Sequence, residues 1–209
     1  WYPSPTESLT FGGFWKEYKK PIERTFVARS GSTPVGTFQN AESATILGLE
    51  LSGRFELGNF RDWLGGPEFL DRLYLMGNLA LMTSEVELAR QGIATNLTRT
   101  LDGQADYAFN AQAGYSGEKH DVTLAFNSVG TRLHRAGIQG LGDVFLQPVN
   151  RLDFVWTWRV WEGDTTNGIF RLSGSNLTNP TFLWLQDGEV WREFEKGIDI
   201  SADFKLTFR

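Results

Sequence analysis

Cysteine is absent from the 209-residue sequence, and histidine occurs only twice. The chain therefore contains neither a disulfide framework nor a thiolate metal site. No run of about eighteen apolar residues occurs, so the sequence predicts no transmembrane helix. The net charge of −5 is opposite in sign to the basic surface that nucleic-acid binders present. We therefore expect no nucleic-acid partner.

The residues that catalysis or metal binding would require do not form a recognisable motif. His120 is predicted at a short turn and His134 near the rim of a long loop, and neither belongs to an HxH or HExxH motif. No serine lies in the context of a nucleophile elbow. The glycine-rich stretch 137–142 does not follow a strand and open a helix, as a dinucleotide-binding loop must. The sequence therefore predicts no enzyme, no metal site and no cofactor.

The main positive signal is an alternation of apolar and polar residues, which is clearest in the last stretch of the chain, 198–209. Side chains of a strand point alternately to its two faces, so one face of this stretch is wholly apolar. The stretch is about as long as a tilted transmembrane β-strand, although an edge strand of a soluble β domain alternates in the same way. The apolar face comprises Ile198, Ile200, Ala202, Phe204, Leu206 and Phe208.

Seven further segments alternate similarly, and the connections between the predicted strands alternate in length. Long connections are predicted at 22–40, 83–104, 135–150 and 179–195, with short turns between them, the first at 65–67. Outer-membrane β-barrels join antiparallel strands by short turns on the periplasmic side and long loops outside. The sequence therefore predicts an all-β fold, a transmembrane antiparallel up-and-down β-barrel of about eight strands. The predicted strands are 8–19, 45–57, 73–81, 107–116, 122–127, 152–160, 170–173 and 198–209.

The alternation also assigns side chains to positions in a barrel. Polar residues opposite the apolar face would face the lumen, where they touch a solute or, in the simpler interpretation, form a hydrogen-bonded wall. Aromatic residues would form belts at the membrane interfaces, although for Trp156 and Trp158, in mid-strand, lipid-facing packing is an alternative. The predicted lumen-facing residues are Glu50, Arg54, Glu56, Asn110, Gln112, Asn127 and Arg159. The predicted belt residues are Trp15, Tyr107, Tyr115, Trp156 and Trp158.

Several segments resemble the late barrel strands of TonB-dependent outer-membrane receptors. The stretch 37–45 (TFQNAESAT), followed by 48–51 (GLEL), is similar to the start of a strand, xNxxxAxxxGxE, that recurs in that family. The stretch 14–23 (FWKEYKKPIE) is similar to the strand and loop that precede it. Further segments follow in the family's order, so that the likeness spans nearly the whole chain. These segments are 101–115, 126–132, 147–154, 174–179 and the terminal strand.

This resemblance implies a plugged barrel of about twenty-two strands. In that family an N-terminal plug and a TonB-interacting segment couple the uptake of a scarce nutrient, such as a metal chelate, to energy from the inner membrane. Residues 1–209 contain no candidate for the plug, and the chain begins at Trp1 without a secretion signal. We therefore expect 1–209 to be the C-terminal portion of the barrel domain.

The resemblance also implies the partners of the chain. These are the lipid bilayer of the bacterial outer membrane, the missing N-terminal barrel and plug, TonB through that plug, a small-molecule ligand that the sequence does not identify, and the barrel-assembly machinery. The assembly signal is expected in Phe204, Leu206 and Phe208. Members of the family usually end on an aromatic residue, whereas here Phe208 is followed by Arg209.

Two other functions stay open at this point. A free-standing small outer-membrane barrel, with a structural or assembly role, would require the first and last strands to pair with each other. A soluble β-barrel that binds an apolar ligand would direct its apolar faces inward and would not need detergent. None of the three functions is enzymatic.

Overall fold

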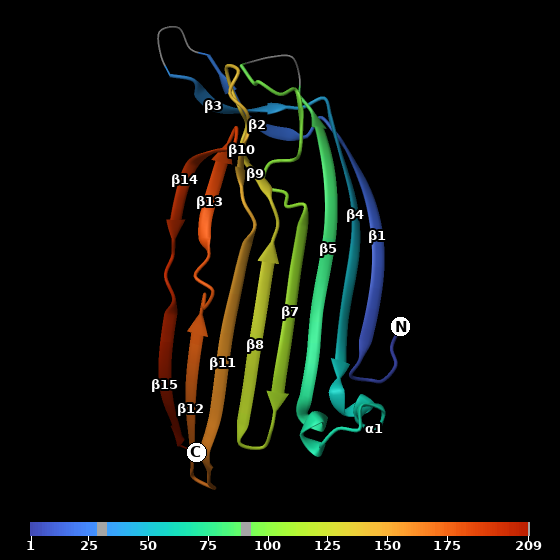
Figure 1. The fold of residues 1–209 in the computed structure, drawn as a ribbon, viewed down its shortest axis with the longest axis vertical. Coiled ribbons are helices and arrows are strands. Elements are labelled where there is room, and N and C mark those ends of the chain that lie inside the picture. Colours follow the sequence, from blue (N-terminus) through green and yellow to red (C-terminus); the bar gives the residue numbers. More distant parts are fainter. Residues whose placement is uncertain (29–32, 89–92, 209) are drawn as a thin grey trace.

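The computed structural model describes residues 1–28, 33–88 and 93–208 (Figure 1). All eight predicted strands are present and lie side by side in one antiparallel sheet. The all-β, antiparallel fold that the alternation predicted is therefore confirmed. In sheet order the strands are β1 (Ser8–Lys19), β4 (Ser43–Glu56), β5 (Leu73–Glu87), β7 (Tyr107–Ser116), β8 (His120–Val129), β11 (Val149–Glu162), β12 (Thr166–Ser175) and β15 (Asp199–Phe208).

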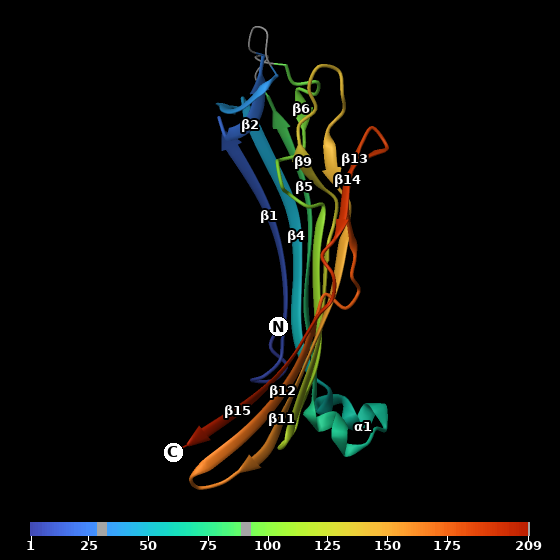
Figure 2. The ribbon, with the colours of Figure 1, turned by 90° about the vertical axis from the view of Figure 1, so that its left-hand side faces the viewer.

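The large sheet is open at both sides. β1 and β15 are its edge strands, and in the described ranges they do not pair with each other. Seen edge-on, the sheet is long, narrow and twisted (Figure 2). The pairing that a self-contained barrel of eight strands requires is thus not formed. Closure into a barrel stays a prediction.

The long connections at one end of the sheet contain further strands, and we call this end the loop layer (Figure 1). The sequence pattern predicted no strands there, which was wrong because such short runs barely show alternation. β2 and β3 form a hairpin, β6 pairs with β5, and the other four form a sheet in the order β14–β13–β10–β9. The strands are β2 (Ile22–Val27), β3 (Val35–Asn40), β6 (Thr98–Arg99), β9 (Arg132–Arg135), β10 (Val144–Leu146), β13 (Thr181–Gln186) and β14 (Glu189–Glu195).

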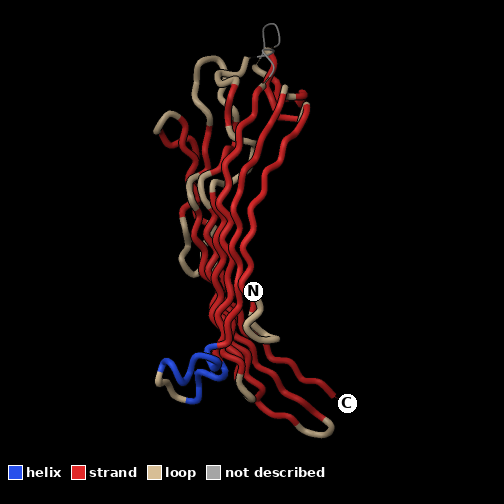
Figure 3. Tube along the Cα trace, turned by 90° about the vertical axis from the view of Figure 1, so that its right-hand side faces the viewer, coloured by secondary structure: helices blue, strands red, loops and turns tan. Residues whose placement is uncertain are grey.

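The opposite end of the sheet carries tighter connections and the helices (Figure 3). Hairpin turns join β7 to β8 and β11 to β12. β4 and β5 are joined by η1 (Leu57–Phe60), α1 (Arg61–Leu64) and η2 (Glu68–Arg72), instead of the short polar turn predicted at 65–67. Gly65 ends α1 in the left-handed conformation, with φ of 60°. None of the helices in the described part of the chain has the length and apolar character to cross a membrane.

The buried apolar core lies at the loop-layer end of the molecule. One cluster of buried side chains forms around Val86, near the end of β5, and another forms around Trp184 of β13. In the described ranges, no apolar side chain of β7, β8, β11, β12 or β15 is buried. The large sheet therefore gains its stability from hydrogen-bonded strand pairing and from contacts of its two faces with their surroundings.

An aromatic ring lies over a glycine where β1 and β4 pair. Phe14 pairs with Gly48, which is buried. A Cβ atom added to Gly48 would stand 2.3 Å from Cζ of Phe14. Gly12, on the same face of β1, has open space at the corresponding position. Side-chain volume is thus restricted at Gly48 and not at Gly12.

We expect Gly48→Ala to lower the free energy of unfolding by about 1–3 kcal/mol, because the new methyl group overpacks against the Phe14 ring. Gly12→Ala, the matched control, should leave that free energy unchanged or raise it by up to about 1 kcal/mol. Urea unfolding of the protein in detergent micelles, followed by tryptophan fluorescence, measures both. Equal losses for the two alanine variants would contradict the packing argument.

Candidate functional site

One face of the large sheet is apolar across all eight strands. Residues that pair directly across antiparallel strands project to the same face. Leu51 pairs with both Phe11 and Leu79, and Phe170 pairs with Phe204, so the apolar sides of neighbouring strands coincide. We call this surface the apolar band. Its most exposed members are Phe11, Trp15, Leu47, Leu49, Leu51, Leu75, Leu81, Leu124, Ile200, Phe204, Leu206 and Phe208, from 42% to 76% accessible.

The apolar band has a limited height. On β5 it extends from Leu73 to Leu81, which is about 26 Å along a strand. The next residues on the same face are Thr83, Glu85 and Glu87, which are polar or acidic. A transmembrane β-strand that crosses the bilayer at a tilt needs about 9–11 residues. The nine residues from Leu73 to Leu81 therefore match the length of a tilted transmembrane strand.

Hydrogen bonds mark the border of the apolar band on the neighbouring strands. The Tyr107 hydroxyl lies 3.2 Å from Oγ of Ser128, which in turn donates to Oδ1 of Asn150 at 2.6 Å. These three residues of β7, β8 and β11 share the face of the band and lie at its loop-layer end. On these strands the side chains of this face thus change from apolar to polar within one or two residues.

The border runs obliquely across the strands. On β4 the band begins at Leu47 and on β15 at Ile200, but the strand pairing places Ile200 level with Phe55. From Leu47 to Phe55 is about 26 Å along β4. The shift accumulates over the six strand spacings from β4 to β15, each about 4.8 Å, and corresponds to an inclination of about 40°. The connecting pairs are Ile200–Gly174, Gly174–Phe154, Phe154–Leu124, Leu124–Ala113, Ala113–Leu75 and Leu75–Phe55.

The five predicted belt residues all lie on this apolar face, in two groups. Trp15 and Tyr107 lie toward the loop layer, whereas Tyr115, Trp156 and Trp158 lie toward the short turns. This separation is the one that two interfacial belts require. Contact with membrane interfaces stays a prediction.

His120 belongs to the group at the short-turn end. It is the first residue of β8 rather than part of a turn, and its ring centroid lies 5.9 Å from those of Trp156 and Trp158. Nε1 of Trp156 donates to Nδ1 of His120 at 3.3 Å. This histidine therefore packs in an aromatic stack. In the described ranges, no cluster of three or more histidine, aspartate or glutamate side chains is arranged to hold a metal ion.

The three residues predicted as an assembly signal, Phe204, Leu206 and Phe208, also lie on the apolar face, along β15. All three are exposed, and β15 has a free edge on one side. Arg209 lies outside the described residues. Recognition of this strand by the assembly machinery stays a prediction.

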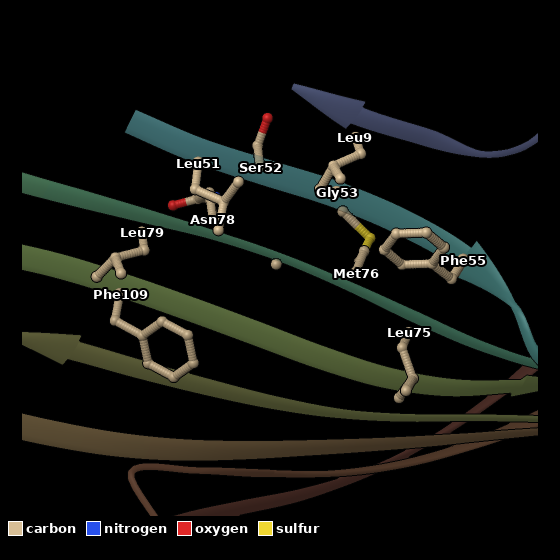
Figure 4. A pocket seen from close by; sticks show the side chains of 11 residues that line it. Leu9, Leu51, Ser52, Gly53, Phe55, Leu75, Met76, Asn78, Leu79 and Phe109 are labelled. Carbon is tan, nitrogen blue, oxygen red and sulfur yellow. The ribbon is translucent and has the colours of Figure 1, made fainter. Parts of the chain in front are cut away.

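A shallow hollow of about 300 Å³ opens in the apolar band (Figure 4). Gly53 of β4 pairs with Gly77 of β5, so neither strand projects a side chain at its centre. Leu51, Leu79 and Phe109 surround it. Because its walls are almost entirely apolar, the hollow suits an alkyl chain and offers little to a polar ligand.

The seven residues predicted to face a lumen all lie on the opposite, polar face of the sheet. They do not converge on one point. Arg54 donates from Nη2 to Oε1 of Glu56 at 2.7 Å, and its guanidinium lies 4.6 Å from the centre of the Tyr74 ring. The Tyr74 hydroxyl accepts a hydrogen bond from Gln112 at 2.8 Å. Glu50 is exposed further along β4.

Two more networks continue along the polar face. Asn110 donates to Asn78 at 2.8 Å and accepts from Asn127, which forms an amide ladder across β5, β7 and β8. Arg159 pairs with Asp121 and donates to the carbonyl oxygens of Gly117 and Glu118, both at 3.1 Å. A hollow of about 220 Å³ lies beside the amide ladder. The polar face thus has the form of a hydrogen-bonded wall, and its position in a lumen stays a prediction.

A buried ion pair in the loop layer was not found from the sequence. Nη2 of Arg99 donates to Oε2 of Glu23 at 2.9 Å, and the two side chains are only 2% and 7% accessible. Burial raises the pKa of Glu23, and the neighbouring charge of Arg99 opposes that rise. The pair ties the β2–β3 hairpin to β6. Because its partners are far apart in the chain, no local pattern indicates it.

His134 of β9 lies at an aromatic and basic surface of the loop layer. Its ring centroid is 5.7 Å from those of Trp184 and Trp191. Partial burial lowers the pKa of His134, because the charged imidazolium is poorly solvated there. Asp102 opposes this shift, whereas Arg24, Arg192 and Arg135 lower the pKa further.

No protein-family model matches the chain, and no curated protein or solved structure matches it. The resemblance to TonB-dependent receptors therefore depends on the quoted motifs and their order. The apolar band is defined by the strand register and the exposure of its side chains, and the polar networks are defined by their hydrogen bonds.

We expect the loop layer to lose stability as the pH falls below about 6.5, the ordinary pKa of histidine. The folded-state pKa of His134 lies below that value, so the unfolded layer binds the proton more readily and protonation favours unfolding. Hydrogen-exchange protection factors of β9, β10, β13 and β14, compared between about pH 7.5 and pH 5.5, measure the loss.

The variant His134→Gln should remove most of this loss, because it cannot take up the proton, while His120→Gln should retain it. An identical pH dependence in the parent protein and in His134→Gln would show that other groups govern the layer.

Proposed function

We propose that this chain is part of the wall of an outer-membrane β-barrel, with its apolar band against the lipid. The observation that carries the proposal is the band itself, which is uncovered, continuous over eight strands and bounded by polar residues. Its length along the strands and its inclination of about 40° agree with those of tilted transmembrane β-strands. A soluble β domain would bury such a face under a second layer.

The open edges support a barrel larger than eight strands. Unpaired backbone N–H and C=O groups are very costly in hydrocarbon, so membrane sheets close completely. Among the residues that the structure describes, β1 and β15 both have a free edge and are not paired with each other. Further strands on both sides would close the sheet. This fits the barrel of about twenty-two strands that the resemblance implies.

We further propose that the complete barrel is a TonB-dependent receptor that takes up a scarce nutrient, such as a metal chelate. In this proposal the polar face lines the lumen and contacts a plug, and the loop layer faces the outside. TonB would act on the plug, outside residues 1–209. The side chains of Arg54, Gln112 and Asn110 are already hydrogen-bonded to neighbours on the polar face. They would therefore form a stiff polar wall along which water, plug and solute move.

We expect a lysine scan along β4 to report the membrane position of each residue. Leu51→Lys, in the middle of the apolar band, should destabilise the membrane-inserted state by about 2–4 kcal/mol. Thr45→Lys, on the same face beyond the border, should cost less than about 1 kcal/mol. Ser52→Lys, next to Leu51 but on the polar face, should cost equally little. Unfolding from phospholipid vesicles measures all three.

A different result would identify a soluble protein. If the parent protein stays folded and monomeric in buffer without detergent, the apolar band is covered by protein and not by lipid. The membrane proposal would then be wrong. Equal costs for Leu51→Lys and Ser52→Lys would contradict the assignment of the two faces.

The receptor proposal predicts the natural protein in the outer-membrane fraction. Intact mass and peptide mapping upstream of Trp1 should reveal a much larger chain that includes a plug domain. If the natural chain begins at or near Trp1, the receptor function does not apply, even if the lysine scan places the sheet in the membrane.

A further inference from the structure

Four neighbouring strands of the large sheet are interrupted just before the loop layer. The small sheet β14–β13–β10–β9 continues the order β15–β12–β11–β8, so each pair of strands forms one long strand with a gap (Figure 1). The register of β8 and β11 continues across the gap, since Val129 pairs with Val149 before it and Arg132 pairs with Leu146 after it. The gaps are 130–131, 147–148, 176–180 and 196–198.

Side-chain hydrogen bonds fix the backbone conformation of two of the gaps, 176–180 and 196–198. Asn176, Asn179 and Gly197 adopt φ of 58°, 40° and 87°. Asn176 donates from Nδ2 to the carbonyl oxygen of Gly197 at 2.7 Å, and the amide of Gly197 donates to Oδ1 of Asn179 at 3.0 Å. Thr178 donates to the carbonyl oxygen of Asn150 at 2.8 Å. The interruption is therefore a built feature of the fold.

A hollow of about 460 Å³ lies at this interruption. Pockets for small molecules typically measure about 300–1,000 Å³. The lining includes Asn127, Arg151 and Asp199, which belong to the polar face of the large sheet. Phe182 supplies an apolar wall from β13. The hollow is larger than the one beside the amide ladder and shares Asn127 and Arg151 with it.

Positive charge predominates in the lining. It contains three cations, Arg132, Arg151 and Lys196, and one carboxylate, Asp199. Arg151 pairs with Asp153 at 3.0 Å, but neither Arg132 nor Lys196 takes part in an ion pair among the described residues. Nζ of Lys196 lies 4.5 Å from the centre of the Phe182 ring. Such a grouping is unexpected in a chain of net charge −5, because nearby like charges repel.

We propose that this hollow binds a small anionic solute that carries carboxylate or phosphate groups. Two guanidinium groups offer planar pairs of donors to such an anion, and Lys196 adds a third charge. Phe182 would contact the carbon skeleton of the solute. The inference deepens the proposed function, since it assigns a solute class to the polar face. The anion site itself does not depend on TonB.

The test uses the full natural protein in detergent micelles, with citrate and inorganic phosphate as probes. Titration calorimetry at low ionic strength, where screening is weak, should detect binding of at least one probe. The probe with the higher affinity distinguishes carboxylate from phosphate. Arg132→Gln and Lys196→Gln should each weaken binding by about tenfold or more. Far-UV circular dichroism checks that each variant is folded, and the exposed Lys196 is the substitution least able to disturb the fold.

Arg171→Gln is the matched control. Arg171 lies on the polar face of β12, outside the hollow, so its loss removes the same charge from the same sheet. It should change the affinity by less than about twofold. The inference is overturned if neither probe binds, or if Arg171→Gln weakens binding as much as the variants of the hollow. Neither result bears on the lysine scan of β4, which separates failure of this inference from failure of the membrane proposal.

Discussion

An apolar surface that residues 1–28, 33–88 and 93–208 leave uncovered is the constraint on which the rest of this structure depends. Each Å² of apolar surface left in water forgoes about 25 cal/mol of burial free energy, and the apolar band spans eight strands. The band therefore requires a non-aqueous cover. A lipid bilayer supplies one only if the sheet leaves no polar backbone group unpaired. Among the described residues, the uncovered band and the free edges of β1 and β15 are the two features that the proposed closed sheet with more strands would explain together.

The same constraint explains where the polar residues are. Within the length of the band, the alternate side chains of each strand project to the other face, where many of the polar groups form hydrogen bonds with one another. Arg54 lies between Glu56 and the Tyr74 ring, and Asn110 bridges two neighbouring amides. Chains of such hydrogen bonds polarise one another and resist rearrangement. The polar face is therefore a hydrogen-bonded wall.

Much of this arrangement was predictable because alternation is a local property. The strand containing Leu51 and the strand containing Phe204 show their two faces in the sequence itself, so the eight strands, the apolar face and the seven polar residues were found without a structure. The loop-layer strands were missed because two to seven residues, as in β6 and β14, rarely show a period. Arg99 and Glu23 were missed because only folding brings them together. Closure was not settled, because it depends on which strands pair with β1 and β15.

The interruption of the four strands follows the border of the apolar band. On β8 the last apolar residue of the band is Phe126 and the gap comes at 130–131, whereas on β15 the gap ends at Ile198, just before Ile200. The gap therefore shifts along the strands in the same direction as the border. In the proposed orientation the hollow opens on the polar face near the edge of the bilayer core, where protein and lipid replace part of the surrounding water and lower the effective dielectric constant. Coulombic attraction increases as the dielectric constant falls, so the cations of the hollow would attract an anion more strongly there than on an open surface.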